Sequence, residues 1–217
     1  MLNRRAFIAA MAEASAMLLL GACATETSQD ALGSNAQEEL SEAHAEETQE
    51  QKTTGNVLVA CFSATGNTRA IAQELASSLG ADYLEIEPKE PYTSEDLDYG
   101  DSSTRATAEQ NDGTIRPAIA TALPDWSNYG TVLLGHPIWW GKAPRIMLTL
   151  VESAAEGLAG KQVANFCTSG SSGIDSAADE LMEALPDATW GEGCRFEVDA
   201  AADEIVAWAH ELGFGIA

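Results

Sequence analysis

A continuously apolar run that leads into a turn rich in hydroxyl groups constrains the fold of this chain more than any other stretch. Residues 57–62 (VLVACF) are all apolar, as a strand buried on both faces of a parallel sheet requires. Gly66 permits a tight turn after this strand, and a helix beginning near Asn67 would point its first N–H groups into the turn. The pattern predicts that this turn binds a phosphate group, through Ser63, Ala64, Thr65, Gly66, Asn67 and Thr68.

The same turn contains no lysine and does not match G-x-x-x-x-G-K-[ST], which excludes the phosphate loop of NTPases. A dianion held only by hydroxyls and amides suits a bound mononucleotide better than a phosphate that is being transferred. The alternative interpretation is a Ser/Thr-rich turn that only caps the following helix.

Strand and helix signals alternate from residue 55 to the end of the chain. Further strands are expected at residues 83–86, 131–135, 162–167 and 195–198. Apolar residues at helical spacing lie between and after them, around residues 71–79, 146–150, 174–185 and 205–212. The alternation predicts an α/β fold, a doubly wound five-stranded parallel sheet with right-handed crossovers, for a domain spanning residues 55–217. Ligands of such sheets bind beyond the carboxyl ends of the strands, where the strand order reverses.

Two other segments leave predicted strands at that same edge of the sheet. One contains two adjacent tryptophans, whose faces could flank a flat ring while a glycine lets amides approach the ring edge. Its candidate binding residues are Pro137, Ile138, Trp139, Trp140 and Gly141. The other offers hydroxyls and amides through Thr168, Ser169 and Gly170. The alternatives are rim tryptophans packed on a neighbouring helix and a simple flexible turn.

A long polar segment, residues 87–116, separates the second and third predicted strands. A segment of this size indicates a lid or a partner-docking loop, with a merely solvated excursion as the alternative. Arg105 and Glu109 stand at i and i+4, which favours a short helix there.

The first 23 residues have the pattern of a targeting segment. Arg4 and Arg5 precede an apolar run over residues 6–22, which ends at Cys23. This resembles a bacterial twin-arginine export signal with a lipoprotein box, which implies that Cys23 is the lipidated first residue of the mature protein. The alternative is an N-terminal helix that stays attached. Residues 24–54 are acidic and poor in large apolar residues, so we expect a disordered linker.

Charge and cysteine content exclude several classes of function. The net charge of −23 argues against nucleic acid or an anionic membrane surface as a partner, which leaves a lipid anchor as the expected membrane contact. The four cysteines have no metal-binding spacing, so no metal site is expected. Cys61, Cys167 and Cys194 are interpreted as small buried residues, and no disulfide pairing follows from the sequence.

At residues 57–68, 135–141 and 166–173 the chain resembles flavodoxin-like FMN proteins, and residues 87–99 resemble a subgroup of short bacterial flavodoxins. The resemblance covers residues 55–217 and implies strand order 2-1-3-4-5. It implies FMN phosphate on residues 63–68 and the isoalloxazine against residues 137–141 and 168–170. His136 departs from the pattern, where an aromatic or small residue is expected, and so does Cys61, where tyrosine is commoner. His136 is interpreted as a packed loop histidine, although beside a flavin it could titrate.

The resemblance implies that the flavin carries the chemistry, so no catalytic side chain is expected. An electron carrier outside the cytoplasm, lipid-anchored and docking redox partner proteins through its acidic surface, is favoured. An NAD(P)H:quinone-type reductase is the alternative, with Arg105, Lys142 and Arg145 as residues that could assemble a nicotinamide site. A cofactor-free surface lipoprotein that binds a protein partner is a third interpretation. A response-regulator receiver is excluded because no aspartate follows the strand that ends at Phe62.

Overall fold

The computed structural model describes residues 56–216. The expected export signal with Cys23 and the expected linker lie outside the described residues, so both stay predictions.

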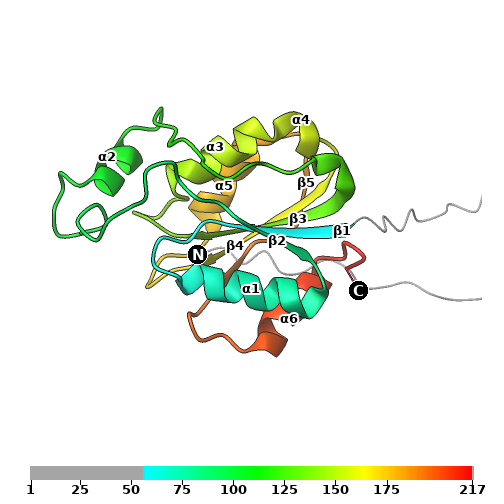
Figure 1. The fold of residues 1–217 in the computed structure, drawn as a ribbon. Coiled ribbons are helices and arrows are strands. Elements are labelled where there is room, and N and C mark those ends of the chain that lie inside the picture. The colour runs from blue at the N-terminus through cyan, green and yellow to red at the C-terminus, as the bar shows by residue number, and fades with distance from the viewer. Residues whose placement is uncertain (1–55, 217) are drawn as a thin grey trace, which may run out of the picture. The chain divides into compact units, whose positions relative to one another are not determined.

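A parallel sheet forms the centre of the described part (Figure 1). Its strands are β1 (Asn56–Cys61), β2 (Asp82–Glu85), β3 (Tyr129–Pro137), β4 (Gln162–Thr168), β5 (Thr189–Trp190) and β6 (Cys194–Phe196). They follow the order β2-β1-β3-β4-β5, and every pairing between them is parallel. The predicted α/β fold, parallel sheet and strand order are therefore confirmed.

The expectation of five strands was wrong by one. Two short strands occupy the outer position beside β4, with β5 on its first residues and β6 on its last. The predicted strand at residues 195–198 overlaps β6. Between the two strands a Cβ at Gly193 would lie 2.7 Å from the Asn165 side-chain oxygen, so this close approach needs glycine. The two-residue β5 is too short to show alternation in the sequence.

Helices cover both faces of the sheet (Figure 1). On one face lie α1 (Asn67–Leu79) and α6 (Ala202–Glu211), and on the other α3 (Arg145–Ser153), α4 (Ala155–Leu158) and α5 (Asp175–Ala184). Alternate residues of β1 enter the two resulting cores: Leu58 and Ala60 one, Val59 and Cys61 the other. This double burial explains the continuous apolar run in the sequence. Between residues 56 and 216, no helix is long and apolar enough to cross a membrane.

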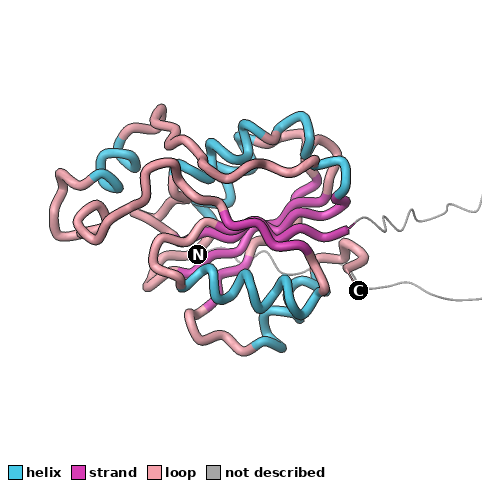
Figure 2. Tube along the Cα trace, in the orientation of Figure 1, coloured by secondary structure: helices cyan, strands magenta, loops and turns pink. Residues whose placement is uncertain are grey.

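The polar segment between β2 and β3 extends beyond the sheet and is mostly loop (Figures 1 and 2). It contains α2 (Arg105–Asn111) and the short 3-10 helix η1 (Trp126–Asn128). The expected pair is present: Arg105 Nε donates to Glu109 Oε1 over 2.8 Å. We call residues 87–119 the excursion.

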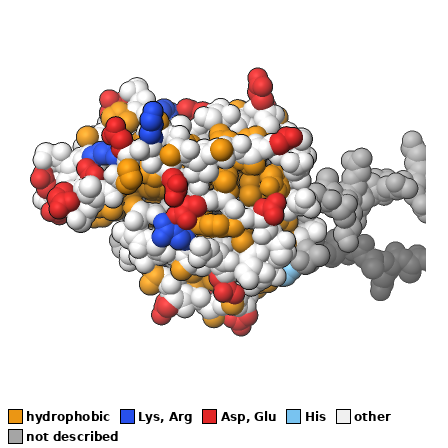
Figure 3. Space-filling model, in the orientation of Figure 1, with side chains coloured by type: hydrophobic (Ala, Val, Ile, Leu, Met, Phe, Trp, Pro, Cys, Tyr) orange, Lys and Arg blue, Asp and Glu red, His pale blue; other side chains and the backbone are white. Residues whose placement is uncertain are grey.

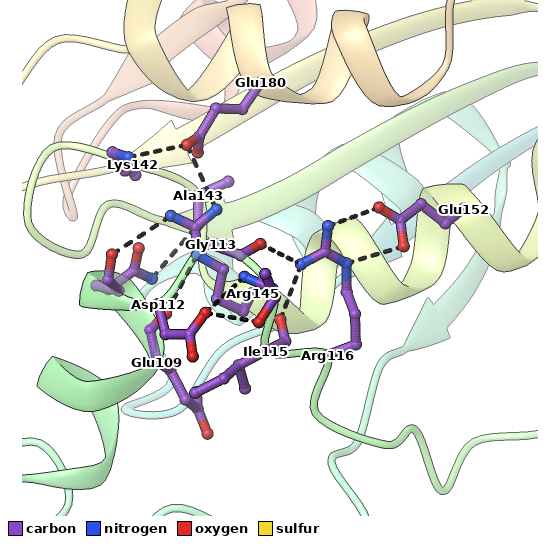
Figure 4. Close-up of polar contacts among 12 residues, drawn as sticks. Glu109, Asp112, Gly113, Ile115, Arg116, Lys142, Ala143, Arg145, Glu152 and Glu180 are labelled. Atoms are coloured by element: carbon purple, nitrogen blue, oxygen red, sulfur yellow. Dashed lines mark hydrogen bonds and ion pairs between the residues drawn. The ribbon is translucent and has the colours of Figure 1, made fainter.

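Two arginines link the excursion to α3 (Figure 4). The buried Arg145, at the start of α3, donates to the carbonyls of Glu109 and Gln110 at the end of α2, over 3.3 and 3.5 Å. Arg116 forms a bidentate pair with Glu152 of α3, with distances of 2.8 and 2.7 Å. These bonds hold the last residues of α2 and the chain that follows it against α3.

Candidate functional site

The turn after β1 has the geometry expected of an anion-binding turn. Gly66, the residue before α1, has φ of 93°, which a residue with a side chain rarely adopts. Its N–H donates to Ser63 Oγ over 3.1 Å, and its carbonyl accepts from Ala70 N–H over 3.0 Å. The next three N–H groups, of Asn67, Thr68 and Arg69, make no hydrogen bond within residues 56–216. Three free N–H groups at the positive end of a helix are the donors that a phosphate requires, so the residues present fit that group.

The side chain of Thr68 is hydrogen-bonded to another residue of the protein and is not free to contact a phosphate. Its Oγ1 lies 2.8 Å from Oγ1 of Thr168, and both side chains are buried. The hydrogen bond joins the turn after β1 to the end of β4, two of the predicted segments. Thr65 and Asn67 remain exposed.

Residues from all three predicted segments line one hollow of about 390 Å³ at this edge of the sheet. The expected residues that line it are Thr65, Asn67, Pro137, Ile138, Trp139, Thr168, Ser169 and Gly170. Sequence reasoning missed Leu97, Tyr99, Glu197 and Val198, which also line it. The first two belong to the excursion, for which the sequence indicated a lid without showing which side chains return to the site.

The other expected residues lie beside this hollow rather than in its wall. Ser63 and Ala64 line a separate hollow of about 270 Å³ toward β2, together with Arg69 and Glu85. Arg69 donates to Glu85 Oε1 over 2.6 Å and to the Ser63 carbonyl over 3.4 Å. A cation therefore does lie beside the turn, although a carboxylate partly neutralises it.

Trp140 and Gly141 form the tip of a tight turn. The backbones of Trp139 and Lys142 exchange two hydrogen bonds of 2.9 and 3.0 Å around them. Trp140 and Gly141 have φ of 49° and 79°, and positive φ at both central residues characterises a type I′ turn. Trp140 is the one non-glycine residue with positive φ between residues 56 and 216.

The two tryptophans have different surroundings. Trp139 is buried, with its ring edge-on to Phe62 and Tyr92 at centroid distances of 5.5 and 4.9 Å. Trp140 is 37% exposed and stacks on Tyr99 at 4.4 Å with an interplanar angle of 26°. Trp140 therefore lies at the rim, stacked on Tyr99 rather than on a neighbouring helix, whereas Trp139 is buried and also lines the hollow.

A partly buried polar network supports Trp139 from the excursion. Tyr92 donates to Glu109 Oε2 over 2.6 Å, and the guanidinium of Arg105 lies 4.1 Å from the centre of the Tyr92 ring. Burial, with the hydrogen bond to Glu109, raises the pKa of the Tyr92 phenol well above its usual value. Tyr92 therefore stays protonated and donates across the physiological pH range.

The three cationic side chains expected to assemble a nicotinamide site are paired with carboxylates. Arg105 pairs with Glu109, and Lys142 and Arg145 both reach Glu180 Oε1, at 3.1 and 3.4 Å (Figure 4). Within residues 56–216 no three or more His, Cys, Asp or Glu side chains gather in a group that could hold a metal ion.

The cysteines of the described part are free thiols. Burial raises the pKa of Cys167 to about 12 and the pKa of Cys61 further. Both are therefore unreactive at neutral pH, as residues that only fill space are.

A doubly wound sheet of this order, with a helix N-terminus open at the end of β1 and an aromatic turn after β3, defines a flavodoxin-like α/β protein. The family model described as Flavodoxin matches residues 56–212, so the chain belongs to the flavodoxin family.

Solved structures agree with this assignment. A protein from Bacteroides eggerthii described as a flavoprotein is 40% identical, with a TM-score of 0.69, over 73% of this chain and 98% of that one. A counterpart from Bacteroides uniformis is 39% identical, with a TM-score of 0.67, over 72% and 98%. A flavoprotein from Lactobacillus acidophilus, solved in complex with FMN, shares the fold at 22% identity and a TM-score of 0.58, over 71% and 99%. No curated protein matches the chain.

Proposed function

We propose that this protein binds FMN at the carboxyl ends of β1, β3 and β4 and carries electrons between redox partner proteins. The observation that carries the proposal is the hollow on which three separate strand-end segments converge, beside a helix N-terminus with free N–H groups. The FMN complex of the Lactobacillus acidophilus protein, which has the same fold, supports the choice of cofactor. When bound, FMN supplies the redox chemistry.

The residues of the chain bind and orient the cofactor. The N–H groups of Asn67, Thr68 and Arg69, with the Thr65 hydroxyl, would hold the phosphate. The wall formed by Pro137, Ile138 and residues 168–170 would orient the ring. Trp139 is part of the same wall, and its packing against Phe62 and Tyr92 would keep the turn in place.

We prefer a carrier to an NAD(P)H-dependent reductase because of the charges. Residues 56–216 contain 25 Asp and Glu against 8 Lys and Arg, a formal charge of −17. Six of these eight cations are paired with carboxylates. No free cationic cluster is therefore left in this part of the chain for the phosphates of a nicotinamide nucleotide.

Partner proteins would dock at the mouth of the hollow. The large apolar side chains exposed on the described surface are Tyr99, Trp140 and Val198. Tyr99 and Val198 line the hollow, and Trp140 stacks on Tyr99. Acidic residues lie next to them in the chain, at Asp98 and Glu197, and Figure 3 shows carboxylates spread over one face of the molecule. A small apolar patch flanked by acidic residues suits a transient interface with a basic partner protein.

We also propose that the protein is exported and lipid-anchored through Cys23 at the outer face of the membrane, with residues 24–54 as the linker between the anchor and the folded domain. The paired arginines, the apolar run and Cys23, in that order, support this. A Cys23→Ser protein that still fractionates with membranes would contradict the anchor.

Titration of the FMN-free protein with FMN tests the cofactor proposal. The wild-type protein should quench the fluorescence of FMN, and Thr65→Val should weaken binding about tenfold, because a hydrogen bond to a charged group is lost. Thr189→Val, an exposed substitution in β5 at the opposite end of β4, is the matched control and should bind as the wild type does. Absence of binding by the wild-type protein would refute the proposal.

A further inference from the structure

One peptide group in the wall of the hollow is hydrogen-bonded through both of its polar atoms. The Ile138 N–H donates to the Thr168 carbonyl over 3.1 Å. The Pro137 carbonyl, at the other end of the same peptide, lies 3.0 Å from Nδ1 of His136. Pro137, Ile138 and Thr168 all line the hollow, whereas His136 is fully buried behind them.

These contacts determine which ring nitrogen of His136 carries the proton. A carbonyl oxygen can only accept, so Nδ1 must donate. In a neutral ring Nε2 then accepts, and Asn165 Nδ2 is 3.2 Å away as its donor. Asn165 is also fully buried, on the neighbouring strand β4. Burial lowers the pKa of His136 to about 4, so the ring is neutral at physiological pH.

We infer that His136 is a positioning residue of the proposed flavin site, whose Nδ1–H keeps the Pro137–Ile138 peptide in one orientation. Turning this peptide would break the bonds to His136 and to Thr168 together. Asn165, by donating to Nε2, selects the tautomer in which Nδ1 is the donor. A wall that is already fixed loses less conformational freedom when a ligand binds.

This inference deepens the proposed function and rests on it for the part that concerns FMN. Its alternative is that His136 only fills space in the core. The two interpretations of His136 can be distinguished by substitution. A space-filling residue can be replaced by another of similar size, whereas a positioning residue must keep its donor at the Nδ1 position.

Each of two amide variants removes one of the two hydrogen bonds of the His136 ring and keeps the other. The side-chain nitrogen of asparagine falls near the position of histidine Nδ1, and the side-chain oxygen of glutamine can take the accepting position of Nε2, facing Asn165 Nδ2. His136→Asn therefore keeps the donor to Pro137 and loses the contact with Asn165, and His136→Gln does the reverse. His136→Phe keeps the ring volume and loses both.

Hydrogen exchange at the Ile138 amide, measured by NMR on the FMN-free protein, reports directly how firmly the Pro137–Ile138 peptide group is held in its hydrogen bonds. We expect exchange about tenfold faster in His136→Gln and His136→Phe and near the wild-type rate in His136→Asn. The FMN dissociation constant should follow the same ranking and rise about five- to tenfold in the first two variants. The melting temperature should fall in all three.

Three results would overturn the inference. One is an FMN dissociation constant that follows the melting temperature instead of the bond to Pro137. Another is Ile138 exchange that is equal in the Asn and Gln variants. The third needs no variant: nitrogen NMR shifts of the wild-type protein that place the His136 proton on Nε2. A wild-type protein that binds no FMN would instead refute the proposed function, while Ile138 exchange would still decide whether His136 holds the peptide.

Discussion

Gly66 and Trp140 both have positive φ at the site, and the two residues differ in what this conformation costs. Glycine adopts φ of 93° without a steric penalty. A tryptophan at 49° is in a sparsely populated region and persists because the two backbone bonds between Trp139 and Lys142 close the turn around it. The strained turn presents the Trp140 ring to Tyr99 and to solvent, where a partner protein would meet it.

The buried His136 predicts a pH dependence of stability. Its pKa is lowered to about 4 by burial, against 6.5 for an ordinary histidine. Between these values the unfolded chain binds a proton that the folded protein does not, so this contribution is complete above pH 6.5 and is lost as pH falls toward 4. The full effect amounts to roughly 3 kcal/mol.

Urea unfolding of the wild-type protein and His136→Phe at pH 7.5 and 4.5 measures this contribution. Carboxylates titrate in both proteins, so only the difference between them reports His136. The wild-type protein should lose more unfolding free energy over this interval than the variant. Equal losses would show that the histidine is not buried as a neutral ring.

At the scale of elements, side-chain contacts hold the excursion in place. Tyr92 donates to the buried Glu109, Arg105 covers the Tyr92 ring, and Arg145 bonds the last carbonyls of α2. None of these bonds involves the tip around residues 97–103, which carries Tyr99. A lid in the proposed site would be this tip and not the whole segment.

Tyr92→Phe should loosen the excursion without unfolding the sheet. The substitution leaves Glu109 Oε2 buried without its donor, which costs about 1–3 kcal/mol. Hydrogen exchange should become faster over residues 88–116 and stay unchanged in β1, β3 and β4. Tyr83→Phe, whose phenol makes only a 3.5 Å contact with Glu85, is the matched control and should leave the excursion protected. Faster exchange throughout the sheet would contradict a local role.

The parallel sheet and the three converging segments could be predicted because each depends on local signals that repeat along the chain, whereas the strand order was implied by the family resemblance. Continuous apolar runs marked β1, β3 and β4, and the rule for parallel sheets placed the site at their carboxyl ends. The contributions of Leu97, Tyr99 and Val198 could not be predicted, since they depend on how long loops return to the sheet. The bond between Thr68 and Thr168 spans 100 residues and has no periodic signal in the sequence.

At the scale of the whole molecule, the formal charge of −17 on residues 56–216 sets which partners approach quickly. Opposite charge steers association, and like charge retards it, within a Debye length of about 8 Å at physiological salt. A basic protein partner is favoured, and an anionic nucleotide such as NADPH is disfavoured.

Stopped-flow reduction of cytochrome c, a basic haem protein, by the reduced FMN-loaded protein tests this steering. The second-order rate constant should fall as ionic strength rises. Asp98→Asn combined with Glu197→Gln should slow the reaction about two- to fivefold at low salt. The charge-matched control, Glu156→Gln with Glu211→Gln, changes α4 and the end of α6 and should have a smaller effect. A rate independent of salt, with rapid NADPH oxidation, would favour the reductase.

The division of the outer strand into β5 and β6 has a consequence for self-association. A long exposed strand presents an unbroken row of N–H and C=O groups, onto which another chain can add a strand and begin to aggregate. Here one margin consists of pieces of two and three residues separated by glycines. At the opposite margin, Lys89 N–H bonds to the carbonyl of Ala118, so the excursion pairs with itself just beyond the four-residue β2. Neither margin offers a template longer than four residues, which disfavours edge-to-edge strand addition between copies of this chain.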